Sequence, residues 1–132
     1  METMNHEYYV SSEIAKLLKE AGFDWKCRKC YNKGVLFDIE PDEIRTQTPQ
    51  HSSYDVLAPT LDVAQRWLRK IKNVVLLVDF NNDEDCEENE RYGVTIYTGK
   101  ERIIELATYP TYEEAQEAGI NKALEIILEK GE

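Results

Sequence analysis

Five apolar residues in a row, Val74-Val75-Leu76-Leu77-Val78, interrupt a chain in which 32% of the residues are charged. The run is too short for a helix and is rich in β-branched side chains, so it predicts a strand. Because no polar residue alternates with the apolar ones, we expect a central strand that is covered on both faces. At 132 residues the chain corresponds to about one domain, which we expect to span residues 1–132.

Three segments have the apolar spacing of amphipathic helices. The first spans residues 11–22, with serines at its start that can cap it and a glycine that can stop it. The second spans residues 60–73 and begins at a threonine of the same capping type. In the third, Thr111 and Glu114 form a capping box. One face of this last helix is lined at four-residue spacing by Ala115, Gly119, Ala123 and Ile127.

Four further segments predict strands. Residues 25–39 have the pattern of a hairpin that turns at Asn32-Lys33-Gly34, residues 92–97 alternate in polarity, and residues 103–107 return. The element order is then α-β-β-α-β-β-β-α. Consecutive strands with short links favour an α+β fold, with an antiparallel sheet of about four to five strands and three helices.

Two long segments, 40–59 and 79–90, predict loops, and we expect residues 1–7 to be disordered. A structureless loop as long as 40–59 is uncommon in a compact domain. It therefore either contains a short strand around residues 54–57 or is a functional or mobile loop.

The balance of charges excludes several classes of protein. Lys and Arg number 16 and Asp and Glu number 26, so the formal net charge is 16 − 26 = −10. This charge disfavours nucleic acid and anionic membranes as partners, and no apolar run approaches the roughly 20 residues of a membrane helix. The chain has three cysteines, and its first seven residues lack the apolar segment of a signal peptide, so we expect reduced thiols in a cytoplasm.

Cys27 and Cys30 form a CxxC pair that resembles half of a zinc ribbon. Zinc usually takes four ligands from two such pairs, so Cys86, His51 or His6 would have to complete the site. Residues three apart on a strand point to opposite faces, which favours two separate thiols, one packed and one exposed. Zinc binding is the alternative.

The acidic segment 79–90 matches part of a calcium-binding loop. Asp79, Asn81, Asp83 and Glu90 supply oxygen ligands at positions one, three, five and twelve. Glu84 stands where the pattern requires glycine, and the flanking segments predict strands rather than helices. A solvated acidic turn is the simpler interpretation, and weak binding of a divalent cation is the alternative.

Four cations gather near the end of the second predicted helix, namely Arg66, Arg69, Lys70 and Lys72. Cations at a helix C-terminus offset its dipole, which explains them structurally. The functional alternative is a patch for an anion or an acidic partner.

The sequence shows no catalytic constellation. The only histidines, His6 and His51, lie in segments without predicted structure, and no nucleophile elbow, phosphate loop or His-containing metal motif is present. We therefore expect a protein that is not an enzyme and has no cofactor.

Three stretches together resemble a known group of proteins: residues 9–23, 58–69 and 109–124. They are similar to small uncharacterised proteins of gut-bacterial (Bacteroides-like) phages and prophages. That group has no established activity, so the resemblance implies no site residue. It implies a bacterial cytoplasm and an origin in a mobile element.

The leading hypothesis is a small acidic interaction protein that binds a host or phage protein, since exposed tyrosines suit interfaces and the chain holds eight tyrosines. The first alternative is a metal-binding module that uses Cys27 and Cys30. The second is an acidic DNA mimic that blocks a host DNA-binding protein. Direct binding of nucleic acid is disfavoured, and a homo-oligomer is compatible with the sequence.

Overall fold

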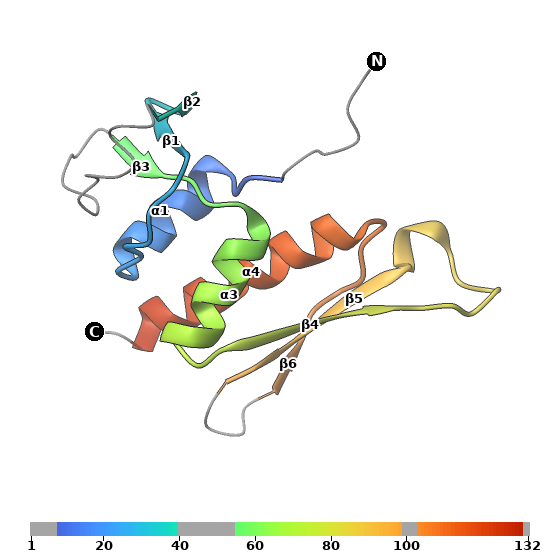
Figure 1. Cartoon of the computed structure of the whole chain (residues 1–132). Coiled ribbons are helices and arrows are strands. Elements are labelled where there is room, and N and C mark those ends of the chain that lie inside the picture. Colours follow the sequence, from blue (N-terminus) through green and yellow to red (C-terminus); the bar gives the residue numbers. More distant parts are fainter. Residues whose placement is uncertain (1–7, 40–54, 99–102, 131–132) are drawn as a thin grey trace, which may run out of the picture. The chain divides into compact units, whose positions relative to one another are not determined.

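The computed structural model describes residues 8–39, 55–98 and 103–130 (Figure 1). The chain divides into two compact units, residues 1–62 (unit 1) and residues 63–132 (unit 2). Each unit combines α-helix with a three-stranded antiparallel sheet, which confirms the α+β class. The six described strands form two sheets, whereas the sequence predicted one sheet of four to five strands. Each unit is described below by itself.

Unit 1 begins with helix α1 (Ser12–Glu20), whose limits follow from its capping residues. The side-chain oxygen of Ser11 accepts a hydrogen bond from the Ile14 N–H at 3.2 Å. At the other end Gly22 has a φ of +97°, the left-handed conformation that glycine adopts without strain. Both features confirm the predicted start and stop of this helix.

The sheet of unit 1 has the strand order β2 (Val35–Asp38), β1 (Lys29–Asn32), β3 (Asp55–Leu57). Lys33 and Gly34 connect β1 to β2 and have φ values of +55° and +82°, as the tightest hairpin turns require. The turn is the predicted one, but β1 starts four residues later than the predicted hairpin. Strand β3 is the short strand expected near residues 54–57. The rest of the expected 40–59 loop up to residue 54, and the segment 1–7, lie outside the described residues.

Unit 2 contains a sheet with the strand order β4 (Val75–Phe80), β5 (Tyr92–Tyr97), β6 (Ile103–Glu105). Strand β4 therefore lies at an edge, and the prediction that it is a central strand is wrong. It also continues to Phe80, so the connection to β5 begins two residues later than the predicted 79–90 loop. This connection contains one short 3-10 turn, η1 (Glu88–Glu90).

Two helices accompany this sheet, α3 (Leu61–Ile71) and α4 (Tyr112–Lys130). The Glu114 N–H donates to the Thr111 side-chain oxygen at 3.1 Å, which confirms the predicted start of α4. Helix α4 contacts both β4 and β5. It comes so close that a Cβ added at Gly119 would lie 2.8 Å from Cγ2 of Val94. The small residues on this helix face therefore allow close packing against the sheet.

The two faces of this sheet are in different environments. On the inner face, toward α4, the side chains of Leu76, Val94 and Ile96 are buried. On the opposite face Val75 and Leu77 are exposed, which contradicts the prediction that both faces of the apolar run are covered. The physical reason is that α4 covers one side of the sheet, and no described element of unit 2 covers the other.

No helix among the described residues is both long and apolar enough to cross a membrane.

Candidate interaction surface

The uncovered side of the sheet in unit 2, which we call the outer face, carries four exposed apolar side chains. Their exposed fractions are 39% for Val75, 47% for Leu77, 38% for Tyr97 and 59% for Ile103. Single exposed apolar residues are ordinary on protein surfaces, but a contiguous group is typical of an interaction site. The outer face therefore qualifies as a candidate site.

Strand register brings these side chains together. Val75 pairs with Tyr97, and Tyr97 pairs with Ile103, so the three form one row across the sheet. Leu77 begins the next row, followed by Thr95 and Glu105. Side chains directly opposite each other on neighbouring strands are close enough to touch, so the apolar groups form one patch across three strands.

A second group of aromatic residues lies on the inner face of the sheet, at the start of α4. The ring of Tyr92 lies 5.3 Å from that of Phe80 and 6.1 Å from that of Tyr112, measured between centroids. The guanidinium carbon of Arg91 lies 5.9 Å from the centre of the Phe80 ring. These contacts join the end of β4 to the first residue of α4, and Phe80 and Tyr112 also remain 58% and 41% exposed.

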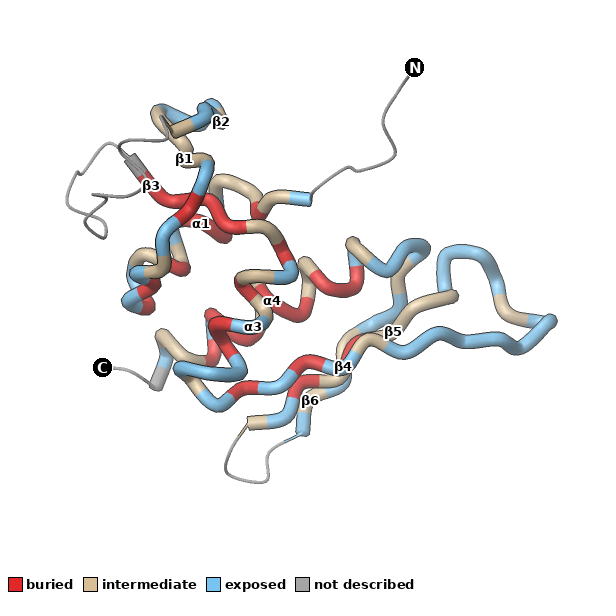
Figure 2. Tube along the Cα trace, in the orientation of Figure 1, coloured by how far each residue is buried: buried red, intermediate tan, exposed pale blue. Residues whose placement is uncertain are grey.

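The connection between β4 and β5 holds the residues expected to bind calcium. Asn81 and Asp83 accept hydrogen bonds through their side chains from the amides of Asp83 and Asp85, both at 3.0 Å. Arg91 donates to the carbonyl oxygens of Asn81 at 3.0 Å and of Asp83 at 3.3 Å. The side chains of Asn81 and Asp83 thus stabilise local turns. The guanidinium of Arg91 forms hydrogen bonds with two carbonyl oxygens of the same segment. In Figure 2 this segment is pale blue almost throughout, which marks it as solvated.

The other two proposed calcium ligands, Asp79 and Glu90, lie in different elements. Asp79 belongs to β4 and pairs with Gly93, whereas Glu90 ends η1. Within residues 8–39, 55–98 and 103–130, no three His, Cys, Asp or Glu residues are grouped so that they could hold a metal ion.

The three thiols lie in different environments. Cys27 precedes β1 and is buried, while Cys30 lies on β1 and is half-buried, so the argument from strand geometry applies only to Cys30. Burial raises the pKa of the Cys27 thiol from 9.0 to about 12, and the neighbouring Cys30 adds to this rise. Zinc binding would have to release the proton of Cys27, and burial makes the loss of that proton less favourable than it is for an exposed thiol.

The remaining zinc candidates are elsewhere. Cys86 belongs to unit 2, where its thiol donates to the carbonyl oxygens of Glu87 at 3.1 Å and of Glu90 at 3.3 Å. His51 and His6 lie outside the described residues.

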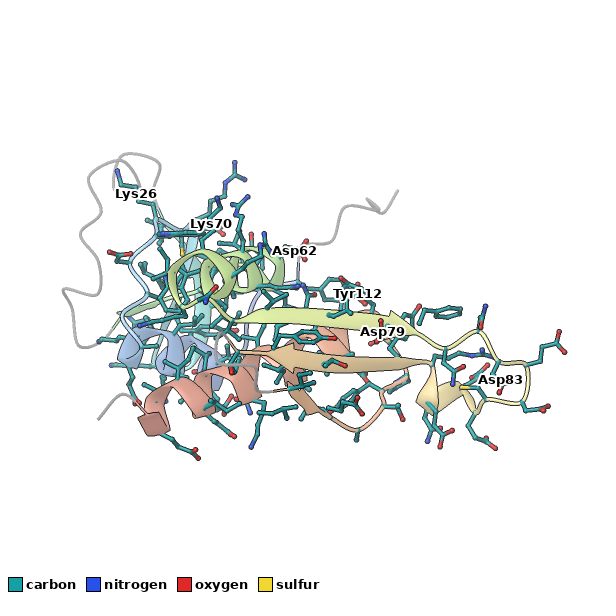
Figure 3. The ribbon with its side chains drawn as sticks, turned by 90° about the horizontal axis from the view of Figure 1, so that it is seen from below. Lys26, Asp62, Lys70, Asp79, Asp83 and Tyr112 are labelled. Carbon is teal, nitrogen blue, oxygen red and sulfur yellow. The ribbon has the colours of Figure 1, made fainter. Side chains whose placement is uncertain are left out.

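The four cations fall near the end of α3, as their spacing predicted. Arg66, Arg69 and Lys70 are exposed, and the ammonium of Lys72 lies 5.6 Å from the centre of the Trp67 ring. Figure 3 shows Lys70 near the beginning of β4 and Asp83 beyond its far end. Unit 2 is thus basic at one end of this strand and acidic at the other.

The sequence did not indicate that the side-chain amides of Gln116 and Gln65 form a hydrogen-bonded pair. Gln116 is buried in α4, and its Nε2 donates to Oε1 of Gln65 at 2.9 Å. Nε2 of Gln65 in turn donates to the carbonyl oxygen of Leu76 at 3.3 Å. The only signal was that Gln116 stands directly beside the small-residue face of α4, where a polar side chain needs a partner.

Comparison of the chain with models of protein families, with curated proteins and with solved structures finds no match in any of the three.

Proposed function

We propose that this chain is a non-enzymatic interaction protein and that it binds a partner protein through the outer face of unit 2. The observation that carries the proposal is the patch of Val75, Leu77, Tyr97 and Ile103, which is exposed to solvent on three adjacent strands. Covering such a patch removes apolar surface from water, which contributes a favourable free energy of roughly 25 cal/mol per Å² of buried surface. This gain is the usual driving force of protein association.

The proposal also covers the kind of partner and the cellular compartment. The resemblance to phage and prophage proteins supports a host or phage protein as the partner, in a bacterial cytoplasm. The absence of a catalytic motif from the sequence supports a binding role rather than a chemical one.

Site-specific photo-crosslinking tests this proposal. A benzophenone amino acid at position 103 lies on the outer face, and the same amino acid at Glu129 lies on the exposed side of α4 as a matched control. In a lysate of Bacteroides-type bacteria at near-physiological salt, we expect one discrete crosslinked species from position 103 and none from position 129. Adding Leu77→Ser should abolish that species.

Two results would contradict the proposal. One is the same set of crosslinked proteins from both positions, which indicates non-specific collisions. The other is a crosslink from position 103 that persists at full yield in the Leu77→Ser variant.

A further inference from the structure

We infer that the outer face takes an amphipathic helix whose apolar side is bordered by Lys and Arg residues. This inference rests on the proposed function, because it names the chemistry of the partner at the same site. Three properties of the outer face support it: the sign of its charges, its width, and the partial cover on the edge of β4.

The charges of the outer face change along the strands. The row Val75, Tyr97, Ile103 is apolar, the next row ends in Glu105, and the third row begins with Asp79. Beyond the third row come the exposed acids of the β4–β5 connection: Asp83, Glu84, Asp85, Glu87, Glu88 and Glu90. Arg91 is engaged with carbonyl oxygens of the same connection. A complementary surface therefore has apolar residues, with positive charges beside them where it meets Asp79, Glu105 and the acidic connection.

A second copy of this chain brings the same excess of acidic residues to the interface. It would place another Asp79 and Glu105 in the interface and add a further net charge of −10. Like charges brought together at an interface cost free energy, so electrostatics favours a basic partner over self-association.

The width of the sheet favours a helix. Three strands about 4.8 Å apart give a face close to the roughly 10 Å diameter of a helix. The inner face of the same strands already shows this match, since α4 contacts both β4 and β5 there. A helix on the outer face would complete a three-layer arrangement around one sheet.

Addition of a partner strand at β4 is hindered, because α3 covers the first part of its edge. The Val74 N–H donates to the carbonyl oxygen of Leu68 at 3.0 Å, and Gln65 donates to the carbonyl oxygen of Leu76 at 3.3 Å. These contacts use backbone groups that a new strand would need. The apolar face is therefore the more accessible feature.

The test uses the full chain and three labelled peptides of about five helical turns, roughly 18 residues each. The first is an amphipathic Leu/Lys helix, the second has Glu in place of Lys, and the third is a scrambled Leu/Lys sequence. Fluorescence anisotropy at about 0.15 M salt measures binding. We expect the Leu/Lys helix to bind at least roughly tenfold more tightly than either of the other two.

Two pairs of substitutions locate the binding. Leu77→Ser with Ile103→Ser should weaken binding of the Leu/Lys helix by roughly tenfold or more, at unchanged net charge. Asp79→Asn with Glu105→Gln should weaken it several-fold and reduce its salt dependence. The control pair Glu125→Gln with Glu129→Gln makes the same change of charge on exposed positions of α4 and should leave binding unchanged. Circular dichroism checks that each variant is folded, and methyl NMR of the unmutated chain should show shifts at Leu77 and Ile103 when peptide is added.

Four outcomes would overturn the inference. The first is equal binding to the serine pair and to the unmutated chain. The second is an equal loss from the α4 control pair, which would mean attraction to net charge alone. The third is a dimer in sedimentation that Ile103→Ser dissociates. The fourth is that no peptide binds. If position 103 then still crosslinks one partner, the helix chemistry is wrong and the proposed function stands; if it does not, both fail.

Discussion

Leu76 and Leu77 are neighbours in one strand, yet Leu76 is 4% exposed and Leu77 is 47% exposed. The same contrast holds along β5, where Ile96 is fully buried and Tyr97 is exposed. The inner face of this sheet is a core built against α4, and the outer face has an apolar composition without a cover. Burial here depends on which element packs against a face, more than on the apolar character of the side chains themselves.

The largest expected effect comes from making one substitution on each face. Ile96→Ala removes buried methyl groups and leaves a cavity, so we expect a loss of about 2–5 kcal/mol in the free energy of unfolding. Ile103→Ala removes the same atoms from an exposed position and should change it by less than about 0.5 kcal/mol. Urea denaturation measures both. Equal losses would show that the outer face is covered in solution.

The next largest expected change in unfolding free energy tests how closely α4 approaches the sheet. A side chain at Gly119 meets Cγ2 of Val94, a stiff β-branched residue, so Gly119→Val should cost about 1–3 kcal/mol through overpacking. At Gly93 an added Cβ meets only Cγ2 of Thr108 at 3.8 Å, an ordinary contact. Gly93→Ala should therefore be nearly neutral. A neutral Gly119→Val would contradict the tight inner interface.

The contrast between covered and uncovered positions extends to the thiols of the chain. Since the pKa of Cys27 is about 12 in the fold and 9.0 without burial, the unfolded chain releases this proton first as pH rises. The stabilising effect of burying the neutral thiol is complete below pH 9 and is lost between pH 9 and 12, by about 1.4 kcal/mol per pH unit. Unfolding free energies at about pH 8 and about pH 10.5 measure this slope. Cys27→Ala should remove that part of the slope, and Cys86→Ala should keep it.

The smallest effect concerns the start of the helix that covers the inner face. Thr111→Ala removes the acceptor for the Glu114 N–H and should cost about 1 kcal/mol. Thr108→Ala, at an exposed threonine three residues earlier, should have little effect. Hydrogen exchange of the Glu114 amide reports the change directly. Unaltered exchange would mean that the cap is not formed in solution.

Local signals in the sequence predicted much of the fold, because caps and turns depend on a few adjacent residues. Ser11, Gly22, Gly34 and Thr111 all have the roles that their residue types indicate. The partition of strands into two sheets was not predictable in this way, because pairing is decided by contacts between distant segments. The apolar run at 74–78 shows the limit, since composition alone does not reveal whether a face has a cover.

The candidate site was only partly predictable. The exposed cations of α3 and the solvated acidic connection follow from helical spacing and polarity. The outer face was missed because Val75 and Leu77 were assigned to a strand that is covered on both faces. Cys27 was placed on a strand because the apolar and polar residues around it alternate, whereas β1 begins two residues later, at Lys29.

The bond from Gln65 to the carbonyl oxygen of Leu76 has a consequence for aggregation. An edge strand of high β-propensity with an apolar face is a template on which further chains can stack into cross-β fibrils. Gln65 and the end of α3 occupy the first part of that edge, and Asp79 places a charge on the second part. Loosening α3 would therefore remove a gatekeeper, even where the free energy of unfolding changes little.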